Sequence, residues 1–169
     1  MNILVTGGAG FIGRWVVKRL LADGHRVWVL DDLSNGRGSN LEEFRDHRLF
    51  QGLTVGDIKD RQVLSRLFEN RFDLCYHLGA SINVQDSIED PETTFNNDTL
   101  GTFYVLEECR KHKTKMVLMS TCMVYDRATN PGGIRETDPV KPASPYAGAK
   151  LAAENMVLSY YHAYGLPTV

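Results

Sequence analysis

The sequence lacks long apolar runs and an excess of charge of either sign. No run approaches the roughly 20 apolar residues that cross a bilayer, and the first residues carry no signal-peptide pattern. Lys plus Arg is 19 and Asp plus Glu is 21, so the net charge is −2. This balance provides no field that would attract nucleic acid or an anionic membrane. We therefore expect neither a nucleic-acid partner nor a membrane partner.

Cysteine is also scarce. Cys75, Cys109 and Cys122 are an odd number without CxxC spacing, which fits a reducing cytoplasm better than a disulfide framework. The five histidines show no spacing typical of metal ligands, either with one another or with cysteine. We expect a cytoplasmic protein with no metal site.

The 169 residues, 43% apolar and 24% charged, suffice for one globular domain. Short apolar runs alternate with segments of helical spacing. The expected strands are 3–5, 27–30, 49–54, 73–78 and 115–119, and the expected helices are 11–21, 63–68, 91–112 and 146–164. A loop is expected over 126–145, with prolines that include Pro131.

This alternation predicts an α/β fold, a doubly wound parallel sheet of the Rossmann type over residues 1–169. Asp90 and Pro91 suit the cap and the first position of the third helix. Residues 165–169 have the pattern of a helix end followed by the opening of a sixth strand. We therefore expect the N-terminal part of a longer protein, with the C-terminal substrate region absent from this chain.

A glycine-rich turn joins the first expected strand to the first helix. Gly7 permits a tight turn, Gly10 lets the backbone approach a pyrophosphate, and Gly13 allows close packing of helix on sheet. Asp31 ends the second strand, where a carboxylate bonds ribose hydroxyls and repels a 2′-phosphate. The pattern predicts NAD rather than NADP. The alternative is a packing turn with a solvent-facing Asp31.

Four further residues carry side chains suited to catalysis or cofactor binding, two on a predicted helix and two after predicted strands. Tyr146 and Lys150 are four residues apart on one helix face, where the ammonium, helped by an oxidised nicotinamide, would lower the tyrosine pKa. Tyr146 could then take a proton from a substrate hydroxyl. Thr121 follows the fifth strand and could bond the substrate oxygen or Tyr146. Asp57, after the third strand, could reach the adenine end of the cofactor or cap a helix.

The chain resembles the cofactor-binding part of the extended short-chain dehydrogenases/reductases, the nucleotide-sugar epimerases and dehydratases. The matching segments are 6–13, 30–33, 56–58, 77–80, 100–102, 120–121, 124–125 and 144–150. The resemblance implies a homodimer, and it implies that Thr121, Tyr146 and Lys150 are catalytic. It implies an NAD site made of Gly7, Gly10, Phe11, Ile12, Gly13, Asp31, Asp32, Asp57, Ile58, Leu78, Gly79, Ala80, Ser120, Tyr146 and Lys150. It implies a nucleotide-sugar site that includes Ser81, Thr121 and Tyr146.

Several positions depart from the family pattern. Cys122 and Met123 stand where 4,6-dehydratases carry Asp-Glu, and the decarboxylases keep a Glu at the position of Met123. Neither side chain can do that work, so the prediction is an NAD-dependent nucleotide-sugar epimerase that acts at C4 through a 4-keto intermediate. The alternatives are a dehydratase, decarboxylase or reductase of the same family, or a non-catalytic NAD-binding module. Asp98 stands where Asn is common, and Asp126 where Gly commonly follows Val-Tyr.

Overall fold

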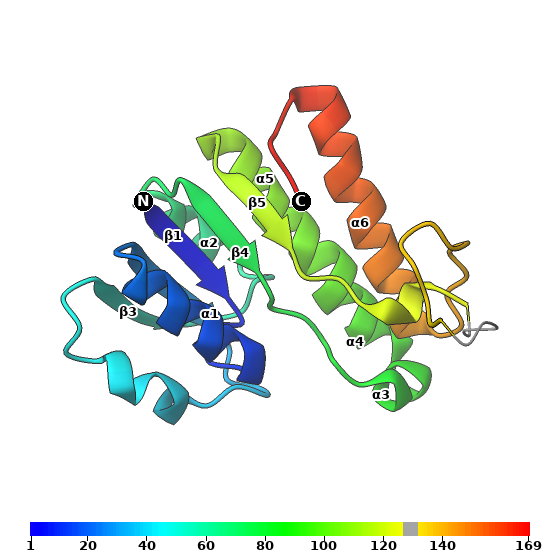
Figure 1. The fold of residues 1–169 in the computed structure, drawn as a ribbon, viewed down its shortest axis with the longest axis horizontal. Helices are drawn as coiled ribbons and strands as arrows, with labels where there is room; N and C mark the ends of the chain where they lie inside the picture. The colour runs from blue at the N-terminus through cyan, green and yellow to red at the C-terminus, as the bar shows by residue number, and fades with distance from the viewer. Residues whose placement is uncertain (127–131) are drawn as a thin grey trace.

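The computed structural model describes residues 1–126 and 132–169, and its centre is a five-stranded parallel sheet (Figure 1). The strands are β1 Asn2–Thr6, β2 Arg26–Asp31, β3 Phe50–Val55, β4 Leu74–His77 and β5 Lys115–Leu118. Their order in the sheet is β3-β2-β1-β4-β5, so the chain winds outward from β1 first to one side and then to the other. The predicted doubly wound α/β fold is confirmed. In such sheets ligands bind at the carboxyl edge where the winding reverses, which here lies between β1 and β4.

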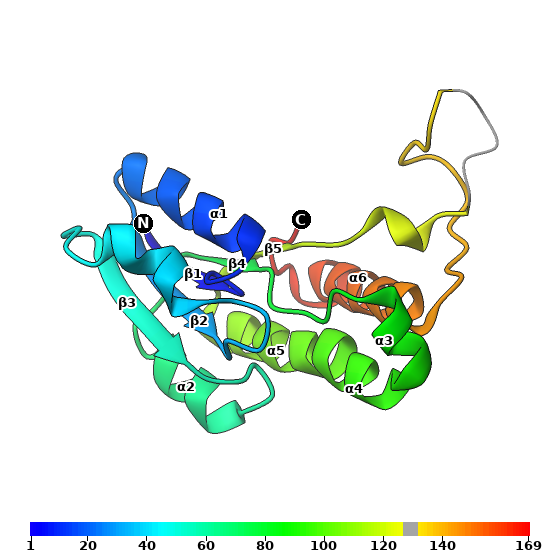
Figure 2. The same ribbon diagram turned by 90° about the horizontal axis from the view of Figure 1, so that it is seen from below.

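Helices cover both faces of the sheet (Figure 2). The helical segments are α1 Phe11–Ala22, η1 Gly38–Phe44, α2 Arg61–Phe68, α3 Val84–Glu89, α4 Pro91–Phe95, η2 Asn96–Gly101, α5 Thr102–His112, η3 Cys122–Val124 and α6 Pro145–Tyr164. Side chains alternate along β1: Ile3 packs with Val17 of α1, whereas Leu4 packs with Phe68 of α2 and Leu106 of α5. The two apolar clusters bury the sheet between the helix layers and hold its carboxyl edge in place.

The region expected as one helix over 91–112 is more complex. Asp90 does cap α4, because its side chain accepts the Thr93 N–H, and Pro91 follows at the first position. The helix then widens into the π-helical segment η2 before α5 begins. The preceding helix α3, capped by Asn83, and the 3₁₀ segment η1 were not predicted, since both are short and mostly polar.

The last residues run beside β5. Met116 donates its N–H to the Pro167 carbonyl at 3.0 Å, and Leu118 donates to the Val169 carbonyl at 2.8 Å. This parallel pairing agrees with the predicted opening of another strand. Of the expected loop at 126–145, Pro131 lies outside the described residues, and Pro145 begins α6 rather than ending the loop.

Candidate functional site

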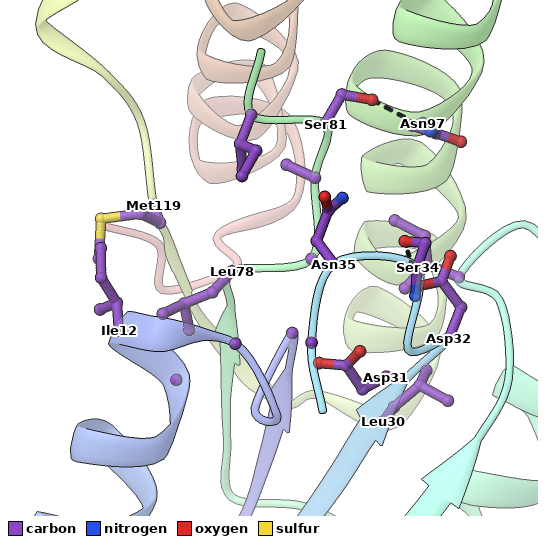
Figure 3. Close-up of a pocket in the computed structure, with 18 of the residues that line it drawn as sticks. Ile12, Leu30, Asp31, Asp32, Ser34, Asn35, Leu78, Ser81, Asn97 and Met119 are labelled. Atoms are coloured by element: carbon purple, nitrogen blue, oxygen red, sulfur yellow. Dashed lines mark hydrogen bonds between the residues drawn. The ribbon is translucent and has the colours of Figure 1, made fainter. Parts of the chain in front are cut away.

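A cavity of about 500 Å³ opens at the carboxyl edge of the sheet, at the ends of β1, β2 and β4 (Figure 3). This volume lies in the range of small-molecule sites, roughly 300–1,000 Å³. Every residue predicted to bind the cofactor lies on its lining, and so does Ser81. Met119 and Ile12 lie at one end of the view and Asp31 and Asp32 at the other. The lining residues that the sequence reasoning missed are Leu30, Ser34, Asn35, Gly36, Gly56, Ile82, Asn97 and Met119.

The glycine turn has the geometry that its sequence predicts. Gly7 has a positive φ of 68°, and a Cβ there would lie 2.7 Å from the backbone nitrogen of Gly79. A Cβ on Gly13 would lie 2.2 Å from the Gly7 carbonyl oxygen, so α1 packs directly on the turn. Gly10 caps α1 and provides no side-chain acceptor for the first N–H groups of the helix. The first residues of α1 line the cavity, so the free N–H groups and the positive end of the helix dipole lie at its wall.

Asp31 and Asp32 follow the glycine turn around the cavity. Asp31 is only 7% exposed, so the alternative of a solvent-facing Asp31 is wrong. Its Oδ2 accepts the Ala9 N–H and its Oδ1 accepts the Leu33 N–H, each at 2.9 Å. A carboxylate oxygen has two lone pairs, so each oxygen can still accept a bond from a ligand. Asp32 is exposed and binds both the N–H and the hydroxyl of Ser34.

The loop after β3 provides another wall. Asp57 does not cap α2; that role belongs to Asp60, whose side chain accepts the N–H groups of Gln62 and Val63. The capping alternative for Asp57 is therefore wrong. Asp57 instead forms an ion pair with Lys59, with 3.0 Å between Oδ2 and Nζ. The following Ile58 packs on Gly101 of η2, where a Cβ would lie 2.6 Å from the Ile58 Cδ1.

The predicted catalytic residues come together at the opposite wall. Ser144 caps α6 by accepting the Ala147 N–H at 3.1 Å, and Tyr146 and Lys150 follow one turn apart on this helix. Tyr146 is half-buried and Lys150 is 4% exposed, and both line the cavity. Thr121 does not line it: its Oγ1 accepts the Met123 N–H at 3.2 Å at the cap of η3, and its hydroxyl lowers the pKa of Tyr146. Tyr146 and Lys150 thus lie on the cavity side of one helix, as their four-residue spacing predicts.

The electrostatics of this group differ from the sequence expectation. Burial raises the pKa of Tyr146, and the charges of Asp98 and Cys122 act in the same direction. Among the described residues, the Thr121 hydroxyl is the one group that lowers it. Burial lowers the pKa of Lys150, and Asp98 and Glu154 oppose that change. Lys150 is not among the groups that shift the Tyr146 pKa, and the net shift from the protein groups alone is upward. The expected lowering, which also involves an oxidised nicotinamide, stays a prediction.

Polar atoms near these residues are left for a ligand. The Ser120 hydroxyl oxygen is buried and has no hydrogen-bond partner in the described part of the chain. A buried polar atom without a partner is costly, so a ligand with polar groups would stabilise it. Ser81 is held by Asn97, whose Nδ2 donates to the Ser81 Oγ at 3.0 Å (Figure 3). The Ser81 hydroxyl oxygen therefore acts as an acceptor for Asn97 on the cavity wall.

Two further searches covered residues 1–126 and 132–169. No cluster of three or more His, Cys, Asp or Glu side chains there could hold a metal ion. None of the helices there combines the length and the apolar character needed to cross a bilayer.

Comparison with known proteins identifies the family. The family model described as GDP-mannose 4,6 dehydratase matches residues 4–169. The chain belongs to the nucleotide-sugar epimerase/dehydratase family. A UDP-glucose 4-epimerase of Mycolicibacterium smegmatis is 38% identical over 167 residues, which are 98% of this chain and 53% of that protein. A dTDP-glucose 4,6-dehydratase of the same organism is 35% identical over 98% of this chain and 50% of its own length.

Solved structures superpose closely on the chain. Pal from Bacillus thuringiensis is 65% identical with a TM-score of 0.98, over 100% of this chain and 54% of that one. A UDP-glucose 4-epimerase of Thermus thermophilus in complex with NAD is 36% identical with a TM-score of 0.92, over 99% of this chain and 53% of that one. The chain thus spans about half the length of the relatives it matches.

Proposed function

We propose that this chain is the cofactor-binding part of an NAD-dependent nucleotide-sugar epimerase that acts at C4. The observation that carries the proposal is the meeting of Thr121, Tyr146 and Lys150 beside a cavity whose other walls are the glycine turn and Asp31. A hydroxyl, a phenol and an ammonium group at one wall are the parts needed to move a proton to and from a sugar hydroxyl. Relatives that act on nucleotide sugars, among them UDP-glucose 4-epimerases, support the substrate class.

The residues on the cavity lining fit NAD. The uncapped N-terminus of α1 at Gly10 would bind the pyrophosphate, since it offers N–H groups and a positive dipole end. The buried Asp31 carboxylate would accept from the adenosine ribose and would repel a 2′-phosphate. Lys150 and Tyr146 would hold the nicotinamide ribose, and the unpartnered Ser120 hydroxyl lies on the same side. Related structures that contain NAD support this assignment.

Bound NAD supplies an acceptor for the hydride at C4 and returns that hydride to complete the cycle. Tyr146 accepts the proton of the C4 hydroxyl and later gives it back, while Thr121 donates to the reacting oxygen and holds it beside the phenol. Lys150, buried at the back of the wall, keeps positive charge near the phenolate. Epimerisation also requires the 4-keto sugar to present its other face before the hydride returns.

The positions after Thr121 favour epimerisation over elimination. Elimination of water across C5 and C6 needs an acid and a base, and Cys122 and Met123 occupy the positions where dehydratases carry that pair. A thioether cannot transfer a proton. Because the relatives include 4,6-dehydratases as well as 4-epimerases, dehydration is the second candidate.

The test uses the full-length protein, incubated with NAD and with UDP-, GDP-, CDP- and dTDP-sugars in turn. Chromatography coupled to mass spectrometry separates the outcomes. A new isomer of unchanged mass supports the epimerase, whereas loss of water indicates a dehydratase and loss of carbon dioxide a decarboxylase. A second incubation, with NADH and a 4-keto nucleotide sugar, detects a reductase as a mass gain of two hydrogens together with oxidation of NADH. Tight NAD binding without turnover of any sugar would overturn the enzyme proposal in favour of a non-catalytic module.

We further propose a cytoplasmic location and a homodimer. The three cysteines are all free, which fits a reducing compartment. Ile88, Phe95 and Leu158 are exposed apolar side chains on α3, α4 and α6, helices that pack together. Burial of these side chains against a second copy would stabilise a dimer. Sedimentation of the full-length protein would measure its oligomeric state, and a monomer at micromolar concentration would contradict this.

A further inference from the structure

A carboxyl group is buried behind the proposed catalytic wall. Asp98, in the π-helical segment η2, is 0% exposed. Its Oδ1 accepts the Ser81 N–H at 2.6 Å, whereas its buried Oδ2 has no hydrogen-bond partner in the described residues. A half-satisfied buried carboxylate is costly, so another group must compensate its charge. Burial accordingly raises the pKa of Asp98 to about 6, and the Ser81 amide and the Lys150 charge oppose that rise.

The positive charge that acts on Asp98 is that of Lys150 on α6. Lys150 is also buried, and the negative charge of Asp98 raises its pKa against the effect of burial. Opposite charges in a poorly solvated interior interact more strongly than on the surface, even without direct contact. Each group therefore helps the other to stay ionised. The same negative charge faces Tyr146 and raises the pKa of that phenol.

The backbone of Asp98 is held by a chain of buried hydrogen bonds. The Thr102 hydroxyl donates to the Asp98 carbonyl at 2.6 Å, so it accepts from His77 Nε2, which lies 3.0 Å away. His77 Nδ1 then accepts from the Thr6 hydroxyl at 2.6 Å. Burial, with a smaller effect of Lys150, lowers the pKa of His77 to about 3, so the ring is neutral. This chain ties Asp98 to the ends of β4 and β1.

Ser81, on the cavity wall, forms two hydrogen bonds with side chains of η2. Asp98 accepts its N–H, and the adjacent Asn97 donates to its hydroxyl at 3.0 Å. Lys59 in turn donates to the Asn97 carbonyl oxygen, which fixes the orientation of that amide. The loop after β4 is thus anchored through two successive side chains of one helix segment. Wide π-helical turns of this kind are frequent at functional sites.

We propose that Asp98 is a positioning residue for the site: its fully buried carboxylate anchors the loop after β4 through the Ser81 amide, and its negative charge acts on the buried Lys150 and on Tyr146 from the same poorly solvated interior. This inference rests on the proposed function for its catalytic meaning. The charged and titratable groups around the three residues are His77, held neutral on β4, Glu154 beside Lys150 and Cys122 beside Tyr146. Asn at position 98 could serve as the anchor but could not supply the charge.

The experiment separates the charge from the anchor in the full-length protein. Asp98→Asn keeps an acceptor for the Ser81 N–H and removes the charge, whereas Asp98→Ala removes both. The matched control is Glu92→Gln, which removes an exposed carboxylate from α4 on the same helical run. Tyrosinate absorbance is titrated without NAD, and each curve is compared with that of its Tyr146→Phe version to isolate one phenol. Hydrogen exchange of the segment around Ser81 is measured in parallel.

We expect Tyr146 to ionise at a pH lower by about half a unit to one unit in D98N, and at an unchanged pH in the control. We expect the Ser81 segment to exchange roughly tenfold faster in D98A than in D98N, since loss of about 1.4 kcal/mol of local stability changes the open population tenfold. The proposal is overturned if Tyr146 ionises at the same pH in D98N as in the parent. It is also overturned if the Ser81 segment exchanges hydrogen at the same rate in D98A and D98N. If D98A does not fold, the D98N titration decides.

Neither readout requires turnover or bound cofactor. A protein that converts no nucleotide sugar would therefore defeat the proposed function and leave the test of Asp98 intact. Conversely, if the protein is an active epimerase and Tyr146 titrates at the same pH in D98N as in the parent, only this inference is contradicted.

Discussion

Replacement of Gly13 by alanine is expected to displace the first turn of α1. The new Cβ would lie 2.2 Å from the Gly7 carbonyl oxygen and 2.6 Å from the Gly8 Cα, and both are backbone atoms that cannot rotate away. The closest distance must open to at least 3.0 Å, the shortest approach that real Cβ atoms show. Overpacking of this kind costs about 1–3 kcal/mol.

The displacement has two measurable results. The free energy of unfolding of the full-length protein in urea should fall by about 1–3 kcal/mol. Because the same turn would bind the pyrophosphate, NAD affinity should fall roughly tenfold or more. Calorimetric titration with NAD measures the second effect.

A matched substitution controls for the added methyl group. Gly148 lies inside α6, and a Cβ there would meet nothing within 4 Å. Gly148→Ala should therefore stabilise the protein by about 0.5–1 kcal/mol, since glycine is unfavourable within a helix. If Gly13→Ala is as stable as the parent and binds NAD equally well, the close packing of α1 on the turn is not what the geometry indicates.

Further substitutions test the catalytic wall and a surface network. Tyr146→Phe should reduce turnover by roughly a hundredfold to ten-thousandfold while NAD affinity is retained; near-normal turnover would contradict its role as the base. Thr121→Val should shift the acid limb of the turnover profile to higher pH, because the hydroxyl lowers the pKa of Tyr146, and Thr121→Ser should not. Hydrogen bonds from Arg110, the larger effect, and from Tyr160 lower the pKa of Glu107 from 4.5 to about 2. The stability from this ionised group is present above pH 4.5 and lost as pH falls toward about 2, so urea unfolding of Glu107→Gln should be less acid-sensitive than that of the parent.

Local signals in the sequence were sufficient for the sheet and much of the candidate site. Apolar runs and helical spacing placed all five strands and the principal helices, because burial of one face repeats with the period of the element. The glycine turn was predictable because its path needs a positive φ at Gly7 and leaves no room for a Cβ at Gly13. Tyr146 and Lys150 share a wall because four residues make about one helical turn.

Other features depend on contacts between segments that are remote in the sequence. Spacing alone left the role of Asp57 open between the cofactor and a helix cap, and in the structure Asp60 caps α2. The predicted effect of Lys150 on Tyr146 ignored burial, which depends on how α6 packs against the rest of the molecule. Desolvation is a property of the whole fold and has no local sequence pattern.

The sequence by itself determined the parallel α/β fold, the glycine turn for a dinucleotide and the spacing of the tyrosine and lysine. The resemblance to the family marked Asp98 as a departure from the usual Asn, without indicating its surroundings. Only the tertiary structure decided that this carboxyl group is fully buried, that it carries the Ser81 amide and that it acts on Lys150. The physical reason is that helical period and turn sterics act between near neighbours, whereas burial and charge coupling arise only when β4, η2 and α6 pack together.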